Sequence, residues 1–182
     1  MNIISTIIEG VYIIEPHVFE DERGYFFESY NKSKFESSGL YYDFIQDNQS
    51  MSSYGTVRGL HFQKGEYAQA KLVRVLEGTV LDVAVDLRKG SVTYGKHVAV
   101  ELSAENKRQL MIPRGFAHGF SVLSETAVFA YKCDNLYCKE AEGGIHFNDP
   151  VLAIDWHIDM SRALTSEKDR MLPSLAEFES CF

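Results

Sequence analysis

The chain has 182 residues, a length that suits one domain with a substantial hydrophobic core. Hydrophobic residues make up 45% of it and aromatic residues 13%, which excludes an intrinsically disordered chain. Asp and Glu number 26 against 18 Lys and Arg, and the net charge of −8 argues against non-specific nucleic-acid binding. The sequence therefore predicts a single globular domain over residues 1–182 that has no nucleic-acid partner.

Neither a membrane anchor nor a secretory signal is visible in the sequence. The first basic residue is Arg23, whereas a secretory signal needs a basic start and a continuous apolar segment. No apolar run approaches the length that spans a membrane. Cys133, Cys138 and Cys181 are odd in number and form no Cys-x-x-Cys pair, so their spacing indicates neither a disulfide framework nor a zinc site. We expect a cytoplasmic protein without a membrane partner.

The first thirty residues are expected to form short strands that are unusually apolar for an exposed sheet edge. An edge of that kind needs covering, because its unpaired backbone groups would otherwise pair with other chains. Exchange of the strands within residues 1–30 with a second subunit would cover it, and dimers are the commonest oligomers. The sequence therefore predicts a homodimer with exchanged N-terminal strands.

Two short helices are expected, one on each side of the strand-rich region. Asn31 is a candidate N-cap for the first, and Gly39 lies just past its end. The second helix is expected around Ser166–Met171, before a turn at Pro173.

Strand signals dominate the middle of the chain. Between Val80 and Leu87, four apolar residues alternate with Asp82, Ala84 and Asp86, which is the period of a β-strand. Glycine-containing pairs at 77–78 and 89–90 indicate turns. Three further segments are β-rich: Lys71–Leu76, His97–Leu102 and Thr126–Lys132. Many short strands with little helix predict an all-β sandwich or barrel with a few short helices.

Residues 55–78 carry a motif with chemical content. Gly55, His61 and Gly78 stand at the spacing of the first motif of cupin barrels, which this segment resembles. Gln63 occupies the place of the second metal-binding histidine, and Lys71 occupies the place of the ligating glutamate. An ammonium group has no lone pair to give a metal and repels a cation. The motif therefore predicts a cupin-like barrel with no metal ligands.

The residues that remain suit proton transfer. His61 is a possible general base, because an imidazole titrates near neutrality, and Lys71 could stabilise an enolate formed next to a carbonyl. The alternative for His61, a buried histidine held by a hydrogen bond, is disfavoured by the motif spacing. Such a base needs an orienting carboxylate, and Asp169 is a candidate. Ser166-x-x-Asp169 is also a helix-capping pattern, so the residues alone leave both roles open.

A second cupin-like signature is Pro-x-Gly-x-x-His, which ends at His118. This histidine could donate a hydrogen bond to a substrate oxygen, or it could be a core histidine satisfied by the backbone. Nothing in the local sequence separates the two.

Three arginines, Arg23, Arg58 and Arg114, are possible phosphate ligands, because a guanidinium pairs with phosphate bidentately. Each taken singly is better explained as a solvated surface charge. Arg58 and His61 are three residues apart, so a regular strand would point them to opposite faces. Both can line one pocket only if the strand is irregular, and Gly59 would permit a bulge.

These segments together resemble the dTDP-4-dehydrorhamnose 3,5-epimerase family over nearly the whole chain. The matching segments are ERGYFFE at 22–28, QDNQSMSSYGTVRGLHFQ at 46–63, QAKLVRVLEGTVLDVAVDLR at 69–88, PRGFAHGF at 113–120, the strand that contains Tyr131, and NDPVLAIDW at 148–156. The resemblance implies a cupin, or double-stranded β-helix (jelly-roll), barrel. It also implies a cofactor-free isomerase that inverts C3 and C5 of dTDP-4-dehydro-6-deoxy-D-glucose to give dTDP-4-dehydro-L-rhamnose.

The same resemblance implies catalytic roles. His61 would take the protons from C3 and C5, with Asp169 orienting its ring. Lys71 would stabilise the enolate oxygen, and Tyr131 would deliver a proton to the opposite face.

The resemblance also implies a set of substrate-binding residues. Arg23 and Arg58 would hold the diphosphate, with the Arg23 segment reaching into the site of the partner subunit. The nucleoside contacts would come from Glu28, Gln46 and Asn48, and the pocket would be completed by His118, Tyr137, Glu142 and Lys168.

Three alternative functions compete with this one. The first is a C3-only or C5-only epimerase, or a 3,4-ketoisomerase, acting on a related dTDP-sugar. The pair of Lys71 and Tyr131 favours an epimerase, but single and double epimerisation look the same in the sequence. The second is a metal cupin such as a dioxygenase, against which Gln63 and Lys71 argue. The third is a non-catalytic sugar-nucleotide binding module, which would have no need for His61 or Tyr131. No Gly-x-Gly-x-x-Gly motif for a dinucleotide cofactor is present.

Overall fold

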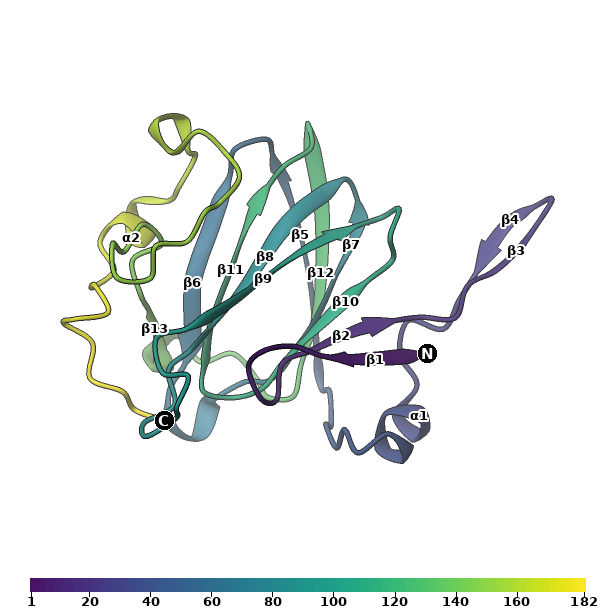
Figure 1. The fold of residues 1–182 in the computed structure, drawn as a ribbon, viewed down its shortest axis with the longest axis horizontal. Coiled ribbons are helices and arrows are strands. Elements are labelled where there is room, and N and C mark those ends of the chain that lie inside the picture. The colour runs from purple at the N-terminus through teal and green to yellow at the C-terminus, as the bar shows by residue number, and fades with distance from the viewer.

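Two antiparallel β-sheets face each other in the computed structural model, which describes all residues 1–182 (Figure 1). The six-stranded sheet has the order β1 (Asn2–Ser5), β2 (Tyr12–Glu15), β10 (Gln109–Ile112), β7 (Lys71–Glu77), β12 (Thr126–Cys133) and β5 (Gln46–Ser53). The five-stranded sheet has the order β13 (Glu142–Gly144), β6 (Val57–Gln63), β11 (Phe116–Val122), β8 (Thr79–Asp86) and β9 (His97–Ser103).

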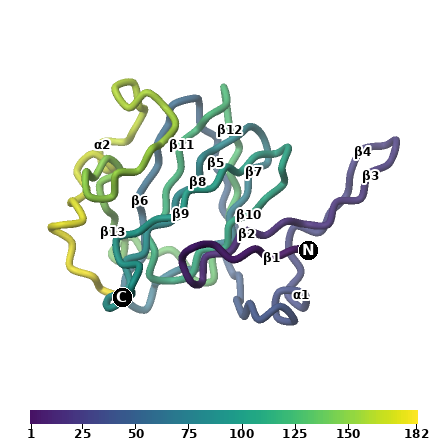
Figure 2. Tube along the Cα trace, viewed as in Figure 1, coloured from purple at the N-terminus to yellow at the C-terminus, as the bar shows by residue number.

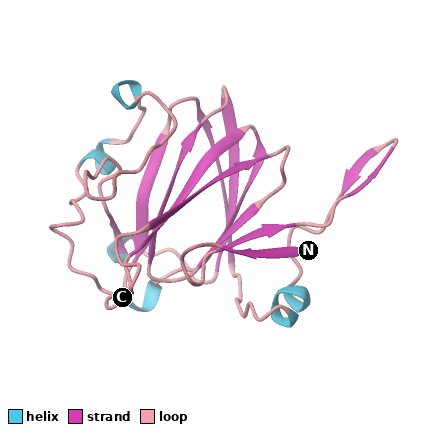
Figure 3. Ribbon diagram, in the orientation of Figure 1, coloured by secondary structure: helices cyan, strands magenta, loops and turns pink.

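Helical structure is confined to short pieces outside the sheets (Figure 3). The two α-helices are α1 (Lys32–Ser37) and α2 (Glu167–Arg170). Three single 3₁₀ turns lie at Gly65–Tyr67, Lys139–Ala141 and Met160–Arg162. The all-β jelly-roll barrel of the cupin type that the sequence predicted is therefore confirmed. No helix is long and apolar enough to cross a membrane.

The alternating pattern of β8 explains how the barrel is built. Leu81, Val83 and Val85 pack on the outer face of the five-stranded sheet, whereas Val80 and Ala84 face the core between the sheets. Sixteen buried residues form this inner core, including Phe120 and Phe129, whose rings stack 4.3 Å apart. Successive side chains of a strand point to opposite faces, and both sets are buried here. Both faces of β8 are therefore covered.

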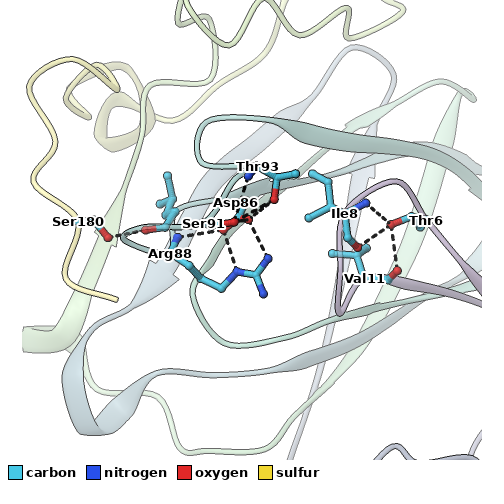
Figure 4. Close-up of polar contacts among 9 residues, drawn as sticks. Thr6, Ile8, Val11, Asp86, Arg88, Ser91, Thr93 and Ser180 are labelled. Atoms are coloured by element: carbon cyan, nitrogen blue, oxygen red, sulfur yellow. Dashed lines mark hydrogen bonds and ion pairs between the residues drawn. The ribbon is translucent and has the colours of Figure 1, made fainter.

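The outer faces of the two sheets are covered by the ends of the chain. Residues 145–182 run along the outside of the five-stranded sheet (Figure 2), where Trp156 is almost fully buried. The Ser180 hydroxyl donates to the carbonyl of Leu87 and holds the end of this segment in place (Figure 4). The segment around α1 covers part of the six-stranded sheet through Phe35 and Leu40.

A buried carboxylate organises the loop between β8 and β9. Asp86 accepts hydrogen bonds from the backbone and guanidinium of Arg88 and from the hydroxyls of Ser91 and Thr93 (Figure 4). Burial would raise the pKa of Asp86, but these bonds outweigh it and lower the pKa to about 2. The loop is therefore held by an anion.

The N-terminal strands separate into two parts. Strands β1 and β2 pair with each other, and β2 joins β10 of the same chain. The hairpin of β3 (Phe19–Asp21) and β4 (Gly24–Phe26) instead projects away from the barrel (Figures 1 and 2). Phe19, Tyr25 and Phe26 are 58%, 60% and 66% exposed on this hairpin. We call this projecting hairpin of β3 and β4 the arm. It is the part of residues 1–30 that is best placed for exchange with a second subunit, and the exchange stays a prediction.

Local predictions along the chain are confirmed. The four expected strands correspond to β7, β8, β9 and β12 within one residue at each end. The side chain of Asn31 accepts from the backbone of Lys34 at the start of α1, and Gly39 follows that helix with a positive φ of 83°. Ser166 caps α2 through a bond from the backbone nitrogen of Asp169.

Candidate active site

A cavity of about 540 Å³ opens between the two sheets at the end of the barrel next to α2. Among its lining residues are seven that the sequence singled out: Arg58, His61, Lys71, His118, Tyr131, Lys168 and Asp169. A smaller cavity of about 150 Å³ shares His61, Lys71 and Tyr131 with it. The smaller cavity adds four more of the predicted residues: Gln46, Asn48, Tyr137 and Glu142.

His61 and Asp169 form a hydrogen-bonded pair at the wall of the larger cavity. Nε2 of His61 lies 2.7 Å from Oδ1 of Asp169, whose side chain is only 5% exposed. Burial would raise the pKa of Asp169, but the hydrogen bond and electrostatic interaction with His61, together with the contacts of Gly59 and Ser166, outweigh burial and lower the pKa. An ionised carboxylate only accepts, so Nε2 carries the proton, and Nδ1, which forms no hydrogen bond within the protein, is left with a lone pair.

Asp169 is both a helix residue and the partner of a histidine. Its backbone nitrogen donates to the hydroxyl of Ser166, the capping contact that the sequence pattern indicated. Its side chain at the same time reaches His61 and accepts a long, 3.4 Å bond from the backbone of Gly59. The two roles that the sequence left as alternatives therefore coexist.

Strand β6 is irregular between Arg58 and His61, where the sequence required a bulge if both residues were to line one pocket. His61 lies opposite His118 on β11, but Arg58 lies opposite Phe120, so β6 has one extra residue in this interval. Arg58 and His61 consequently both line the cavity. A side chain at Gly59 would place its Cβ 2.6 Å from the Cα of Gly119, so only glycine allows β6 and β11 to approach this closely.

Lys71 and Tyr131 come from neighbouring strands of the opposite sheet. The ammonium of Lys71 lies 6.0 Å from the centre of the Tyr131 ring. Burial lowers the pKa of Lys71, and the charge of Asp82 acts in the opposite direction. Burial also raises the pKa of Tyr131, which keeps its phenol protonated. The two sheets thus place a base on one wall and a cation and a phenol on the other.

The side chain of Gln63 is engaged with the backbone. Its side-chain oxygen accepts a 2.8 Å bond from the backbone nitrogen of Cys138, and it is 5% exposed. No group of three or more His, Cys, Asp or Glu side chains is arranged to hold a metal ion.

The smaller cavity carries a polar network. Glu142 forms an ion pair with Lys168 of α2 and accepts a 2.9 Å hydrogen bond from the hydroxyl of Tyr137. Burial would raise the pKa of Glu142, but these two contacts lower it. Gln46 donates to Asn48 and accepts from the backbone of Tyr137. The network joins the loop before β13 to α2.

Two predicted residues lie away from both cavities. Arg23 stands on the projecting hairpin, where its side chain is 86% exposed and pairs with Asp21. Glu28 pairs with Lys34 near α1. A single chain therefore does not bring Arg23 or Glu28 to the site. Arg114, a weaker candidate, is engaged with Asp134 at 3.0 Å.

Two residues of the site were not found from the sequence. Ser52 on β5 accepts a 3.0 Å bond from Nε of Arg58, and Asp82 on β8 lies 2.9 Å from Nε2 of His118. A strand aspartate between valines and leucines is the signal that could have indicated Asp82, because a buried charge needs a partner. Ser52 has no comparable signal in its surroundings.

The arrangement can remove a proton next to a carbonyl and return one from the other side. Nδ1 of His61 is an oriented base, Lys71 supplies positive charge for a developing enolate, and the phenol of Tyr131 supplies a proton. Arg58 adds a guanidinium at the same cavity, which suits a phosphate group.

Comparison with known proteins agrees with this chemistry. A curated relative from Escherichia coli strain K12, dTDP-4-dehydrorhamnose 3,5-epimerase, is 56% identical over 97% of this chain and 96% of its own length. The crystal structure of the Elizabethkingia anophelis enzyme of that name is 61% identical, covers 97% of both chains and has a TM-score of 0.94. A Legionella pneumophila structure in complex with dTDP-4-keto-L-rhamnose is 50% identical, covers 98% of this chain and 94% of its own, and also has a TM-score of 0.94.

A relative with a narrower activity shares the fold. A 3′-monoepimerase from Streptomyces bikiniensis, in complex with dTDP-quinovose, is 32% identical, with a TM-score of 0.89 over 95% of this chain and 87% of its own. The family model described as dTDP-4-dehydrorhamnose 3,5-epimerase matches residues 5–177. From the matching model and from relatives more than half identical over nearly their whole length, the chain belongs to the dTDP-4-dehydrorhamnose 3,5-epimerase family.

Proposed function

We propose that this protein inverts C3 and C5 of dTDP-4-dehydro-6-deoxy-D-glucose and so produces dTDP-4-dehydro-L-rhamnose. The observation that carries the proposal is the placement of His61 with Asp169 on one wall of the cavity and of Lys71 with Tyr131 on the other. The names of the E. coli, E. anophelis and L. pneumophila relatives support the substrate class.

The first half of the reaction is proton abstraction. A hydrogen on the carbon next to a ketone is only weakly acidic, so the base and the group that stabilises the enolate must be positioned together. In the proposal, Nδ1 of His61 takes the proton, and the C–H electron pair moves to the ketone oxygen. The ammonium of Lys71 meets the negative charge there, and Asp169 stabilises the imidazolium.

The second half is protonation from the opposite face. The phenol of Tyr131 donates its proton to the same carbon, and the enolate collapses to a ketone with inverted configuration. The tyrosinate and the imidazolium then exchange protons with solvent and return to their starting states. The same groups act at C3 and at C5, and no step uses a metal or an organic cofactor.

The remaining predicted residues are proposed to bind the nucleotide. Arg58, held by Ser52, would contact the diphosphate, and the network around Glu142 would open onto the nucleoside. Arg23 and Glu28 would complete this part of the site in a second subunit, because the hairpin of β3 and β4 projects away from its own barrel (Figure 1) and its apolar side chains are exposed. A homodimer with exchanged arms and a cytoplasmic location are therefore part of the proposal.

The direct test is incubation of the purified protein with dTDP-4-dehydro-6-deoxy-D-glucose in deuterated buffer. NMR should show deuterium entering at both C3 and C5 and the appearance of the L-rhamno product. Absence of exchange at either carbon under conditions where the E. coli relative turns over would contradict the proposal.

The 3′-monoepimerase from S. bikiniensis gives a specific second candidate, an epimerase that acts at one carbon. It predicts deuterium at C3 alone and a product that retains the configuration at C5. The same NMR spectrum therefore distinguishes the two activities.

A further inference from the structure

A second histidine–carboxylate pair, more deeply buried than the first, stands behind the wall of the larger cavity, which His118 lines. Nε2 of His118 lies 2.9 Å from Oδ2 of Asp82. The Asp82 side chain is completely buried, and that of His118 is 7% exposed. Asp82 belongs to β8 and His118 to the neighbouring strand β11, so the pair is fixed by the rigid sheet rather than by a loop.

Asp82 has no other hydrogen bond in the protein. Its second oxygen, Oδ1, is the only buried side-chain polar atom that lacks a partner. Burying a carboxylate costs free energy unless the group is paired. A buried carboxylate with only one hydrogen bond is therefore expected to have a function that depends on that bond. The contact of Asp82 is the imidazole of His118.

This contact determines which nitrogen of His118 carries the proton. A carboxylate can only accept, so Nε2 donates to Asp82. Burial lowers the pKa of His118, and the positive charge of Lys71 lowers it further, against the opposing effect of Asp82. The imidazole is therefore neutral, and Nδ1 has a lone pair and no hydrogen.

Nδ1 of His118 faces the cavity. It forms no hydrogen bond within the protein, and it is not among the buried atoms that lack a partner, so it is accessible. His118 lies directly opposite His61 in the pairing of β11 with β6, and both residues line the cavity. Directly opposite residues have Cβ atoms about 5 Å apart. Whatever Nδ1 binds lies beside the carbon that His61 would deprotonate.

We propose that Asp82 is a positioning residue that fixes His118 as a hydrogen-bond acceptor for a hydroxyl of the sugar ring. A neutral His118 with its proton on Nε2 cannot donate to the ketone oxygen, which leaves Lys71 as the cationic partner of that oxygen. Because His118 is neutral, it also places no positive charge next to the base, His61. This inference rests on the proposed function, because it assigns a contact to the same substrate.

The variant Asp82→Asn should reverse the roles of the two ring nitrogens. Asparagine has nearly the same shape as aspartate and loses no second hydrogen bond here. One of its amide atoms must occupy the unpartnered position of Oδ1, and a buried carbonyl without a partner is tolerated better than a buried N–H. The amide nitrogen therefore faces His118 and donates to Nε2, and the ring proton moves to Nδ1, as happens when the triad aspartate of trypsin is replaced by asparagine.

The first experiment needs no substrate. Two-bond ¹H–¹⁵N correlation spectra of the free protein distinguish the two neutral forms of histidine, and His118→Gln assigns the His118 signals by their absence. We expect the Nε2–H form in the wild type and the Nδ1–H form in Asp82→Asn. The matched control is His97→Gln, which removes a half-buried histidine of β9 outside the cavity and should leave the His118 signals and the activity unchanged.

The second experiment tests the partner of Nδ1. With the wild type, removing the contacted hydroxyl should lower kcat/KM about tenfold, so one of the 2-deoxy and 3-deoxy analogues of the 4-keto sugar nucleotide should show this loss. With the full substrate, Asp82→Asn should lower kcat/KM about tenfold relative to the wild type. With that analogue, the variant should lower kcat/KM less than about twofold relative to the wild type, because the hydroxyl contact is already absent. A merely structural role for Asp82 would give the same loss on every substrate.

Three outcomes would overturn the inference. The wild-type spectrum could show His118 protonated on Nδ1, Asp82→Asn could leave the Nε2–H form in place, or neither analogue could show a loss that depends on Asp82. The wild-type spectrum alone shows which nitrogen of His118 is protonated, so the inference can be tested even if Asp82→Asn fails to fold. Failure of the proposed function is recognised separately, as an absence of deuterium exchange in the wild type while the His118 spectrum is as expected.

Discussion

His61 and Asp169 are 108 residues apart in the chain, yet their side chains are joined by a 2.7 Å hydrogen bond. The bond connects an irregular strand of the barrel to a helix of four residues, α2. Since the backbone of Asp169 is itself held by Ser166, the capping of this short helix also fixes the carboxylate that orients the ring. The stability of α2 and the orientation of the base are therefore coupled.

Replacing Asp169 with asparagine should cost activity far more than stability. The amide can hold the imidazole with the wrong nitrogen protonated, so we expect kcat to fall on the order of 100-fold or more, with the helix cap intact. Steady-state kinetics and thermal unfolding measure the two effects. Glu167→Gln, at the exposed neighbouring position of α2, should change neither. A loss of melting temperature that accounts for the whole loss of activity would contradict the orienting role.

Variants of His61 and Tyr131 should separate proton removal from proton return. His61→Asn should abolish deuterium exchange at both C3 and C5, because the other imidazole of the cavity, that of His118, has a lowered pKa and is proposed to accept from a sugar hydroxyl instead. Tyr131→Phe removes only a hydroxyl, so His61 can still remove a proton and give one back to the same face. Exchange should continue in Tyr131→Phe while most of the inverted product is lost. NMR in deuterated buffer follows both quantities.

An equal loss of exchange in the two variants would show that Tyr131 is needed for abstraction or for placing the substrate. The assignment of Tyr131 as the acid would then be wrong. Binding of dTDP to each variant, measured by calorimetry, is the control for an intact site.

Activity should survive chelation of metal ions. Gln63 and Lys71 stand where a metal cupin has a histidine and a glutamate, and Gln63 is engaged with the backbone of Cys138. Dialysis against EDTA followed by an exchange assay should give full turnover. Loss of turnover that a divalent ion restores would contradict the metal-free mechanism, and metal analysis of the purified protein is the control.

The exchanged-arm dimer predicts complementation between two inactive proteins. Arg23→Ala removes a proposed diphosphate contact that a subunit gives to its partner, and His61→Asn removes the base of its own site. Coexpression should form heterodimers in which one site has both residues, so activity should rise well above that of either variant alone. Light scattering gives the oligomeric state. A fully active monomer, or heterodimers that stay inactive, would contradict the arm exchange.

Acid sensitivity should depend on Asp86. Its pKa of about 2 in the folded protein, against an ordinary value of 3.8, corresponds to about 2.5 kcal/mol of stability. Because the folded pKa is the lower one, this stability is present above about pH 4 and is lost as the pH falls towards 2. The difference in unfolding free energy between the wild type and Asp86→Asn should therefore shrink over that range. Urea unfolding at each pH measures it, and a constant difference would contradict the linkage.

The sequence by itself determined the elements of this fold and the chemical types of residue at its centre. Alternation with period two specified β8, capping patterns specified both short helices, and the spacing from Gly55 to Gly78 indicated His61 and Lys71. These are local properties, because the period, the cap and the motif each depend on residues close together in the chain.

Only the tertiary structure decided which side chains meet. The partner of His61 comes from a helix near the far end of the chain, and the irregular pairing of β6 with β11 brings Arg58 to the same cavity. The role of Asp82 depended on the burial of both faces of β8, which the alternating pattern of a single strand does not reveal. Contacts of this kind depend on sheet register and packing between distant segments, and neither is encoded in the spacing of neighbouring residues.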